Sequence, residues 1–131
     1  MIVLDENVPG TQRQLLRSWR ISCRRIGVEV GRKGMKDDEI IPLLMQLRRP
    51  TFFTLDLGFF NSRLCHRRYC IAYLAVEEYE AASFARRLLR LEALDTEAKR
   101  MGKVIRASQS GLVIWTSSSQ AEVRLGWQNP C

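Results

Sequence analysis

Histidine is nearly absent from this sequence, which has only His66 among its 131 residues. Histidine is the side chain that most often transfers protons in catalysis, and hydrolysis without a metal needs a positioned acid and a positioned base. A lone histidine flanked by Arg67 and Arg68 cannot supply that pair. We therefore exclude acid and base catalysis by paired histidines, and expect His66 to lie on a solvated loop where it contacts a phosphate or nothing.

Long apolar runs and paired cysteines are also missing. The longest uncharged apolar run is residues 70–76, whereas a membrane-spanning helix needs about 20 such residues, and the sequence opens without a basic leader. The four cysteines, at positions 23, 65, 70 and 131, form no CxxC pair, and Cys65, His66 and Cys70 have no second pair to complete a zinc site. We expect an unexported, cytoplasmic protein without structural zinc.

Acidic residues are outnumbered, because 14 Asp and Glu stand against 21 Lys and Arg, which gives a net charge of +7. Cationic side chains gain affinity for polyanions by displacing the counterions condensed on phosphates. The excess favours nucleic acid as a partner, ahead of an anionic membrane surface. A basic surface that only keeps the protein soluble explains the charge equally well.

The sequence does contain an alternation of short apolar runs and helical periodicity. Residues 2–4 are a continuous apolar run, typical of a strand buried on both faces of a parallel sheet. A helix over residues 9–18 follows, then a weak edge strand around 21–26, a helix from residue 37 that Pro50 stops, and a strand over 51–55. This order predicts parallel strands with right-handed crossovers, covered by helices on both faces.

The second half of the chain continues this pattern and then changes it. Residues 70–76 predict a fourth strand and residues 79–94 a helix, whereas residues 103–127 hold two or three short strands separated by turn residues. The length suits one hydrophobic core. We therefore predict a single α/β domain over residues 1–131, with three α/β/α layers and a mostly parallel sheet that ends in an antiparallel β-meander.

Aspartates follow two of the predicted buried strands. Asp5 ends the first apolar run and Asp56 follows residues 51–55, while Asp37 opens a helix. Parallel strands end at one edge of a sheet, where sites form in open α/β folds, and carboxylates gathered there favour a hard cation such as Mg²⁺ or Mn²⁺. Aspartate also caps helices and turns well, and for Asp37 alone that is the stronger explanation.

Three segments carry a resemblance to a known family. They are residues 3–9 (Val-Leu-Asp-Glu-Asn-Val-Pro), residues 36–40 (Lys-Asp-Asp-Glu-Ile) and residues 54–59 (Thr-Leu-Asp-Leu-Gly-Phe). In order and spacing they resemble the PIN-like domain family over roughly residues 1–77. Members of that family typically read leucine-aspartate-glutamate-asparagine, then an aspartate that opens a helix, then threonine-any-aspartate-any-aspartate-phenylalanine. No single motif is specific, but the three in succession are.

The resemblance implies a metal-dependent endoribonuclease, of a superfamily whose members often serve as the toxin of a toxin-antitoxin pair. Carried over, Asp5, Asp37 and Asp56 are the metal-binding acids, and Glu6 and Asn7 would orient a metal-bound water or support the ligands. The implied cofactor is Mg²⁺ or Mn²⁺, which would polarise the scissile phosphate and lower the pKa of a bound water. The implied partners are RNA, an antitoxin protein and a second copy of the chain, with no membrane.

Gly58 departs from the family pattern, because it stands where the family usually has its second aspartate. On an extended segment an aspartate at 58 would point the same way as Asp56 and could complete the site. Its loss raises a second interpretation, a catalytically weak or inactive PIN-like module that binds RNA or a partner protein. If three acids suffice instead, Gly58 is expected to serve the backbone through a positive φ.

A third and weaker interpretation is a phosphoacceptor site of the receiver-domain type. Asp5, Glu6 and Asp56 superficially form an acidic pair plus an aspartate at a strand end. A receiver also needs a lysine that follows a late strand, whereas Lys103 is predicted to begin one.

A basic and aromatic stretch, residues 59–69, follows Asp56 directly. Cations and aromatic rings commonly hold the backbone and bases of single-stranded nucleic acid, so Arg63, His66, Arg67 and Arg68 are candidate RNA-binding residues. Equally, the phenylalanines at 59 and 60 could pack under the sheet and leave the arginines only solvated. A second basic patch, for which solvation is the commoner explanation, is predicted on one helix face: Arg86, Arg87 and Arg90.

Overall fold

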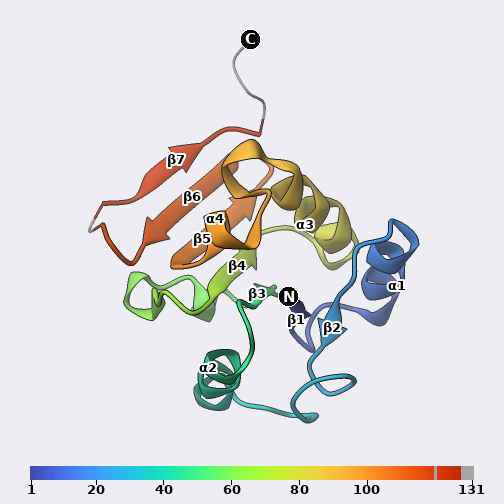
Figure 1. Cartoon of the computed structure of the whole chain (residues 1–131). Helices are drawn as coiled ribbons and strands as arrows, with labels where there is room; N and C mark the ends of the chain where they lie inside the picture. Colours follow the sequence, from blue (N-terminus) through green and yellow to red (C-terminus); the bar gives the residue numbers. More distant parts are fainter. Residues whose placement is uncertain (120, 128–131) are drawn as a thin grey trace.

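The computed structural model describes residues 1–119 and 121–127, which form an α/β protein around one sheet (Figure 1). Its strands are β1 (Ile2–Leu4), β2 (Arg24–Arg25), β3 (Thr51–Thr54), β4 (Cys70–Leu74), β5 (Lys103–Ser108), β6 (Gly111–Thr116) and β7 (Val123–Leu125). Its α-helices are α1 (Gly10–Ser18), α2 (Asp37–Gln46), α3 (Ala81–Arg90) and α4 (Glu97–Arg100). Short 3₁₀ turns are η1 (Leu57–Phe59), η2 (Ser62–Leu64), η3 (Glu78–Glu80) and η4 (Glu92–Leu94).

The sheet has the strand order β2-β1-β3-β4-β5-β6-β7. The first five strands of this order, β2, β1, β3, β4 and β5, pair in parallel. Strands β6 and β7 add antiparallel pairs beside β5. The predicted fold class is therefore confirmed, including the terminal meander. Because the parallel strands run in one direction, they end together at what we call the carboxyl edge and start together at the amino edge.

Hydrophobic clusters cover both faces of the sheet, as the two-residue period of strands requires. Helices α1 and α3 pack on one face, which we call the α3 face, and lie together in Figure 1, away from α2. Helix α2 and residues 57–69 pack on the other, the α2 face. Neighbouring strand residues divide between the faces, with Val3, Phe52, Ile71 and Val104 on the α2 face and Leu4, Phe53, Ala72 and Ile105 on the α3 face.

The helix predicted over residues 79–94 is shorter than expected. Helix α3 ends at Arg90 because Leu91 takes an extended backbone conformation, with φ −67° and ψ 133°. A further helix, α4, which the sequence did not reveal, begins after Thr96, whose hydroxyl accepts a hydrogen bond from the Lys99 N–H at 3.2 Å. The apolar periodicity of residues 81–94 continues across this break, so it gave no sign of where the helix ends.

Arg100 explains why the chain turns back there. Its side chain is buried, and its guanidinium donates to the Thr51 hydroxyl and to the Leu94 carbonyl, both at 2.9 Å. These hydrogen bonds join α4 to the start of β3, which an uninterrupted helix could not reach.

The remaining differences from the predicted elements are small. The strand predicted around residues 21–26 is an edge strand, as expected, but it is shorter and comprises only the two residues of β2. After it, Ile26 makes an isolated bridge to Val30. Helix α2 ends at Gln46, where Leu47 becomes extended, before Pro50 is reached. Of the four cysteines, those at 23, 65 and 70 are free thiols, and Cys131 lies outside the described residues. Over residues 1–119 and 121–127, no helix is long and apolar enough to cross a membrane.

Gln12 provides a test of how α1 is joined to α3. Its buried Oε1 accepts a hydrogen bond from the Ala82 N–H in the first turn of α3, at 2.9 Å. Gln12→Leu would leave this N–H without an acceptor, and we expect urea denaturation to show a free energy of unfolding lower by about 1–3 kcal/mol. Gln14→Leu, at an exposed position of the same helix, is the control and should change it by less than about 0.5 kcal/mol. Equal losses in the two variants would contradict this role of Gln12.

Candidate functional site

The pairing of β1 with β3 sets Asp5 beside Thr54 at the carboxyl edge. The two strands are in parallel register with Leu4 opposite Phe53, and the Asp5 N–H continues the ladder by donating to the Phe53 carbonyl at 2.9 Å. The next positions, Asp5 and Thr54, therefore point to the same face. This is the α2 face, because Val3 and Phe52, two positions earlier, lie in the cluster on that side.

The Thr54 hydroxyl joins three segments. It donates to Asp5 Oδ2 at 2.7 Å and accepts hydrogen bonds from the Asp56 N–H at 3.0 Å and from Asn7 Nδ2 at 3.3 Å. Asn7 also accepts from the Leu55 N–H at 3.2 Å through Oδ1. The end of β1, the loop after it and the turn after β3 are thus held together through one hydroxyl, which the sequence analysis did not identify. The Thr54 side chain is buried, so these hydrogen bonds are shielded from water.

Asp5 is a buried carboxyl, only 8% exposed. Its Oδ1 accepts from the Glu6 N–H at 2.8 Å, and its Oδ2 accepts from Thr54. Burial raises the pKa of Asp5, these two hydrogen bonds oppose the rise, and the negative charges of Asp37 and Asp56 add to it. Each Asp5 oxygen accepts one hydrogen bond and keeps a lone pair for a further partner.

Asp37 and Asp56 reach the same edge from other elements. Asp37 is the first residue of α2, and desolvation together with the charges of Asp56 and Asp38 raises the pKa of Asp37. Asp56 caps η1 and accepts a hydrogen bond from the Gly58 N–H through Oδ1 at 2.8 Å. The three acids therefore lie within electrostatic reach of one another. We call Asp5, Asp37 and Asp56 the acidic edge.

Glu6 and Asn7 have positioning contacts. Glu6 Oε1 accepts a hydrogen bond from the Gly34 N–H at 2.7 Å, which ties the loop before α2 to the end of β1. Gly34 has a positive φ of 77°, a conformation that glycine adopts readily. Glu6 thereby helps to place the start of α2, and with it Asp37, while Asn7 holds the end of β3.

Gly58 does not have the expected conformation. It lies in the 3₁₀ turn η1, and it is not among the glycines with positive φ, so the backbone explanation for this glycine is wrong. The segment is also a turn and not an extended strand. A Cβ at this position would lie 3.2 Å from Asp56 Oδ1, so the side chain of an aspartate here would contact the Asp56 carboxylate from its first carbon onward.

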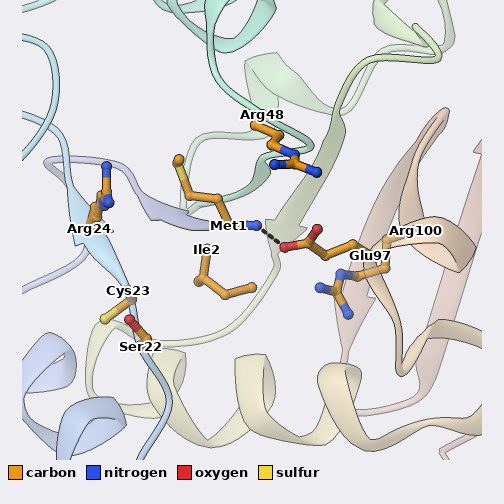
Figure 2. Close-up of a pocket in the computed structure, with 8 residues that line it drawn as sticks. All are labelled: Met1, Ile2, Ser22, Cys23, Arg24, Arg48, Glu97 and Arg100. Atoms are coloured by element: carbon orange, nitrogen blue, oxygen red, sulfur yellow. Dashed lines mark hydrogen bonds and ion pairs between the residues drawn. The ribbon is translucent and has the colours of Figure 1, made fainter.

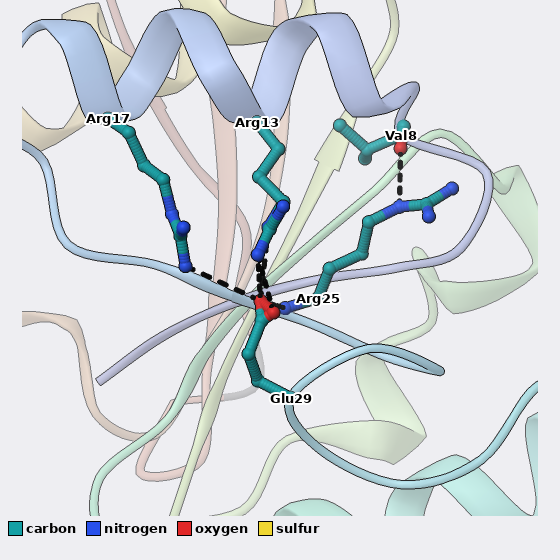
Figure 3. A network of polar contacts seen from close by, with 5 residues as sticks. All are labelled: Val8, Arg13, Arg17, Arg25 and Glu29. Carbon is teal, nitrogen blue, oxygen red and sulfur yellow. Dashed lines mark hydrogen bonds and ion pairs between the residues drawn. The ribbon is translucent and has the colours of Figure 1, made fainter.

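A second network, which the sequence analysis did not identify, supports the loop after β1 (Figure 3). Arg25 donates from Nε to the Val8 carbonyl at 3.0 Å and from Nη2 to the Glu6 carbonyl at 2.7 Å. Glu29 accepts from the Arg25 N–H and from the Arg13 guanidinium, whose Nη2 is 2.7 Å from each Glu29 oxygen. Desolvation of Glu29 is outweighed by these hydrogen bonds and by nearby arginines, so the pKa of Glu29 is lowered.

The predicted RNA-binding stretch runs away from the acidic edge. Phe59 is buried in edge-to-face contact with Phe52, with ring centroids 5.2 Å apart, as the packing explanation expected. His66 stacks on Tyr69 at 5.6 Å, and a Cβ on Gly102 would lie 3.9 Å from Arg67 Cα. Tyr69 and Gly102 directly precede β4 and β5, so His66, Arg67 and Arg68 lie at the amino edge.

Two other predicted features also lie away from the acids. Arg63 lines a hollow with Trp115 and Thr116, which pair with the first two residues of β5 and so lie at the amino edge. Lys103 begins β5 and donates to the Lys99 carbonyl at 2.6 Å, so the lysine that a receiver-type site needs is at the wrong edge. The structure thus brings Asp5, Asp37 and Asp56 together but does not bring the basic stretch to them.

The amino edge has a pocket of about 500 Å³, shown in Figure 2. The Met1 amino group contacts the Glu97 carboxylate there, and Arg24, Arg48 and Arg100 line the walls. Three arginines, an amino group and a single carboxylate that is already paired do not suit a divalent cation. This pocket therefore differs in both position and chemistry from the acidic edge.

No group of three or more His, Cys, Asp or Glu side chains is close enough to hold a metal ion within residues 1–119 and 121–127. Binding of a cation at the acidic edge would therefore require its carboxylates to close further, which the exposed side chain of Asp37 allows. For zinc, burial raises the pKa of the Cys70 thiol to about 12, which disfavours the thiolate that zinc requires.

Asp5 gives a pH dependence of stability. A carboxyl whose pKa is raised by folding stabilises the folded state while protonated, and this contribution is lost as the pH rises from 3.8 through the folded value. Without metal, we expect the free energy of unfolding of the parent, relative to Asp5→Asn, to fall as the pH rises above about 4. Urea titrations measure the difference, with Asp95→Asn as an exposed control. A difference that stays constant with pH would contradict the raised pKa.

The chain was compared with known proteins. No protein-family model, no curated protein and no solved structure matches it.

Proposed function

We propose that the protein is a metal-dependent endoribonuclease of the PIN-like type and that the acidic edge is its catalytic site. The observation that carries the proposal is the proximity of three carboxylates from separate segments of the chain, two of which, Asp5 and Asp56, are held by the Thr54 hydroxyl. Asp37 and Asp56 both raise the pKa of Asp5, and Asp56 raises that of Asp37. Mutually repelling acids at the carboxyl edge of a parallel sheet are a common sign of a functional site.

The donor set fits a hard divalent cation. All three side chains offer carboxylate oxygens, which suit Mg²⁺ or Mn²⁺, and a cation would offset their repulsion. When bound, such a metal supplies charge stabilisation at a scissile phosphate and a more acidic water. The chain's own contribution is to hold Asp5 through Thr54 and Glu6, and to hold Asp56 through the Thr54 and Gly58 contacts.

RNA is the proposed substrate class, on two grounds. The net charge of +7 favours a polyanion, and the three motif segments resemble those of ribonucleases. The resemblance also motivates the proposal that the protein acts as a toxin with an antitoxin protein as its partner.

A second candidate function is a weakly active or inactive module that binds RNA or a partner protein. Gly58 favours it, because the family's second aspartate is missing and the Gly58 N–H occupies one oxygen of Asp56. The two candidates differ in whether the purified protein cleaves RNA, so they can be separated directly.

Metal binding is the first test of the acidic edge. We expect titration calorimetry to show that Asp5→Asn and Asp56→Asn each bind Mn²⁺ at least tenfold (about 1.4 kcal/mol) more weakly than the parent, because each loses one hard ligand. Asp95→Asn, an aspartate paired with Lys99 outside the acidic edge, is the control and should bind as the parent does. If all three variants match the parent, the metal site is misplaced.

Gly58→Asp is the test of catalytic strength. It adds a carboxylate beside Asp56, and we expect it to raise Mn²⁺-dependent cleavage of a labelled single-stranded RNA and to lower stability in chelator. Gly58→Asn is the matched control, since it adds similar bulk without charge. Asp5→Asn should abolish cleavage in either background.

The outcomes of this test separate the candidates. Absence of cleavage in both the parent and Gly58→Asp at saturating Mn²⁺ would favour the inactive module. A fully active parent that Gly58→Asp does not improve would show that three acids suffice.

A further inference from the structure

A single row of side chains links the acidic edge to two arginines across the sheet. The strand registers place Thr54 opposite Tyr73, Tyr73 opposite Arg106, Arg106 opposite Val113, and Val113 opposite Arg124. Residues opposite one another in register point to the same face, so the row continues the α2 face on which Asp5 and Thr54 lie. At the usual spacing of strands, Arg106 is roughly 14 Å from Asp5.

Arg106 is a partly buried cation on this row. Among residues 1–119 and 121–127, its buried Nε has no hydrogen-bond partner, and the ion pairs of that part of the chain do not include it. Its guanidinium lies 5.9 Å from the ring centroid of Phe60. Buried polar groups are nearly always paired, so the hydrogen bonding of the Arg106 guanidinium is incomplete within this part of the chain.

Two hollows that share Ser108 and Ser110 lie at the ends of β4 and β5. The first, of about 310 Å³, is lined by Arg106 and Arg124 together with the hydroxyl residues Ser108 and Ser110. The second, of about 570 Å³, shares those two serines and extends past Tyr73 to Leu55, the neighbour of Asp56. The hollows therefore join Tyr73, the two serines and the two arginines, and the register of β3 with β4 sets Tyr73 beside Thr54, the partner of Asp5.

Aromatic rings stand beside this path. Phe60 and Tyr73 are both half-buried, with centroids 6.5 Å apart and their planes inclined by 32°. Ring faces support unpaired bases, while guanidinium groups bind phosphates through paired N–H donors. Cations, hydroxyls and rings gathered beside one row of the sheet suit single-stranded nucleic acid better than an isolated phosphate, which would need the arginines alone.

We propose that a single-stranded RNA segment lies along this row, with its phosphates on Arg106 and Arg124 and a base against Phe60 and Tyr73. This inference rests on the proposed function, because it takes the acidic edge as the place where the strand is cut. It replaces residues 63–68 as the binding path.

Acidic neighbours set the relative weight of the two arginines. Arg124 is exposed and pairs with Glu122 at 3.1 Å, which offsets part of its charge. Glu77 and Glu80 line the second hollow, which neither arginine lines. Arg106 therefore has the larger share of phosphate binding, and removal of the Glu122 charge should strengthen Arg124.

The experiment is fluorescence anisotropy with a labelled single-stranded RNA in chelator, so that no strand is cut. We expect Arg106→Gln to weaken binding about tenfold and to reduce the slope of log affinity against log salt by about 0.7, the value for one phosphate contact. Arg124→Gln should have a smaller effect, and Glu122→Gln should tighten binding. Arg90→Gln, an exposed arginine on α3, is the control and should change nothing.

Binding and cleavage report separately on the two proposals. If Arg106→Gln and Glu122→Gln both bind as the parent does, or if the parent does not bind RNA at low salt, the path is wrong whatever the acids do. If these variants shift binding as expected but the parent does not cleave with Mn²⁺, the path stands and the nuclease proposal fails.

Discussion

The hydrogen bond from the Thr54 hydroxyl to Asp5 is the contact on which the carboxyl edge depends. A hydroxyl offers one donor and two acceptor sites, and Thr54 uses all three, on Asp5, Asn7 and Asp56. Carboxylates cannot hold one another, because they repel, so a neutral group has to place them. Parallel pairing of β1 with β3 provides that group, since it sets position 54 beside position 5 on one face.

The acidic edge is assembled against its own electrostatics. Burial and two like charges raise the pKa of Asp5, and the hydrogen bonds of Thr54 and Glu6 only partly offset this. A cluster selected for stability alone would replace such a carboxyl with an uncharged group. The surrounding structure compensates, because Arg25 and Asn7 hold the loop after β1 and Glu6 ties down the loop before α2. Like-charged carboxyls held together by these hydrogen bonds favour a functional site over simple capping.

The sequence predicted the parts of this fold that repeat with a clear period. Continuous apolar runs located β1, β3 and β4, and the aspartates after two of them located the carboxyl edge. It did not predict the end of α3 or the helix α4, because the break depends on the buried side chain of Arg100 and its contact with Thr51, a neighbour remote in sequence. The role of Thr54 was missed for a similar reason. Threonine is common in strands, and only the register shows that its hydroxyl meets Asp5.

Register also decides which of the many cations can serve the acids. The net charge favours a polyanion but does not say where it binds, and the basic stretch nearest to Asp56 in sequence leads to the amino edge, because the chain must return there to begin β4 as a parallel strand. Arg106 is remote from Asp56 in sequence, yet it is two strands away from Thr54 on the same face. In a parallel sheet, the residues that can act together are those in register on neighbouring strands. Residues that follow one strand closely in sequence are instead carried back to the opposite edge, a full strand length away. The cations that we propose to serve the acidic edge are therefore those near the ends of later strands, as Arg106 is.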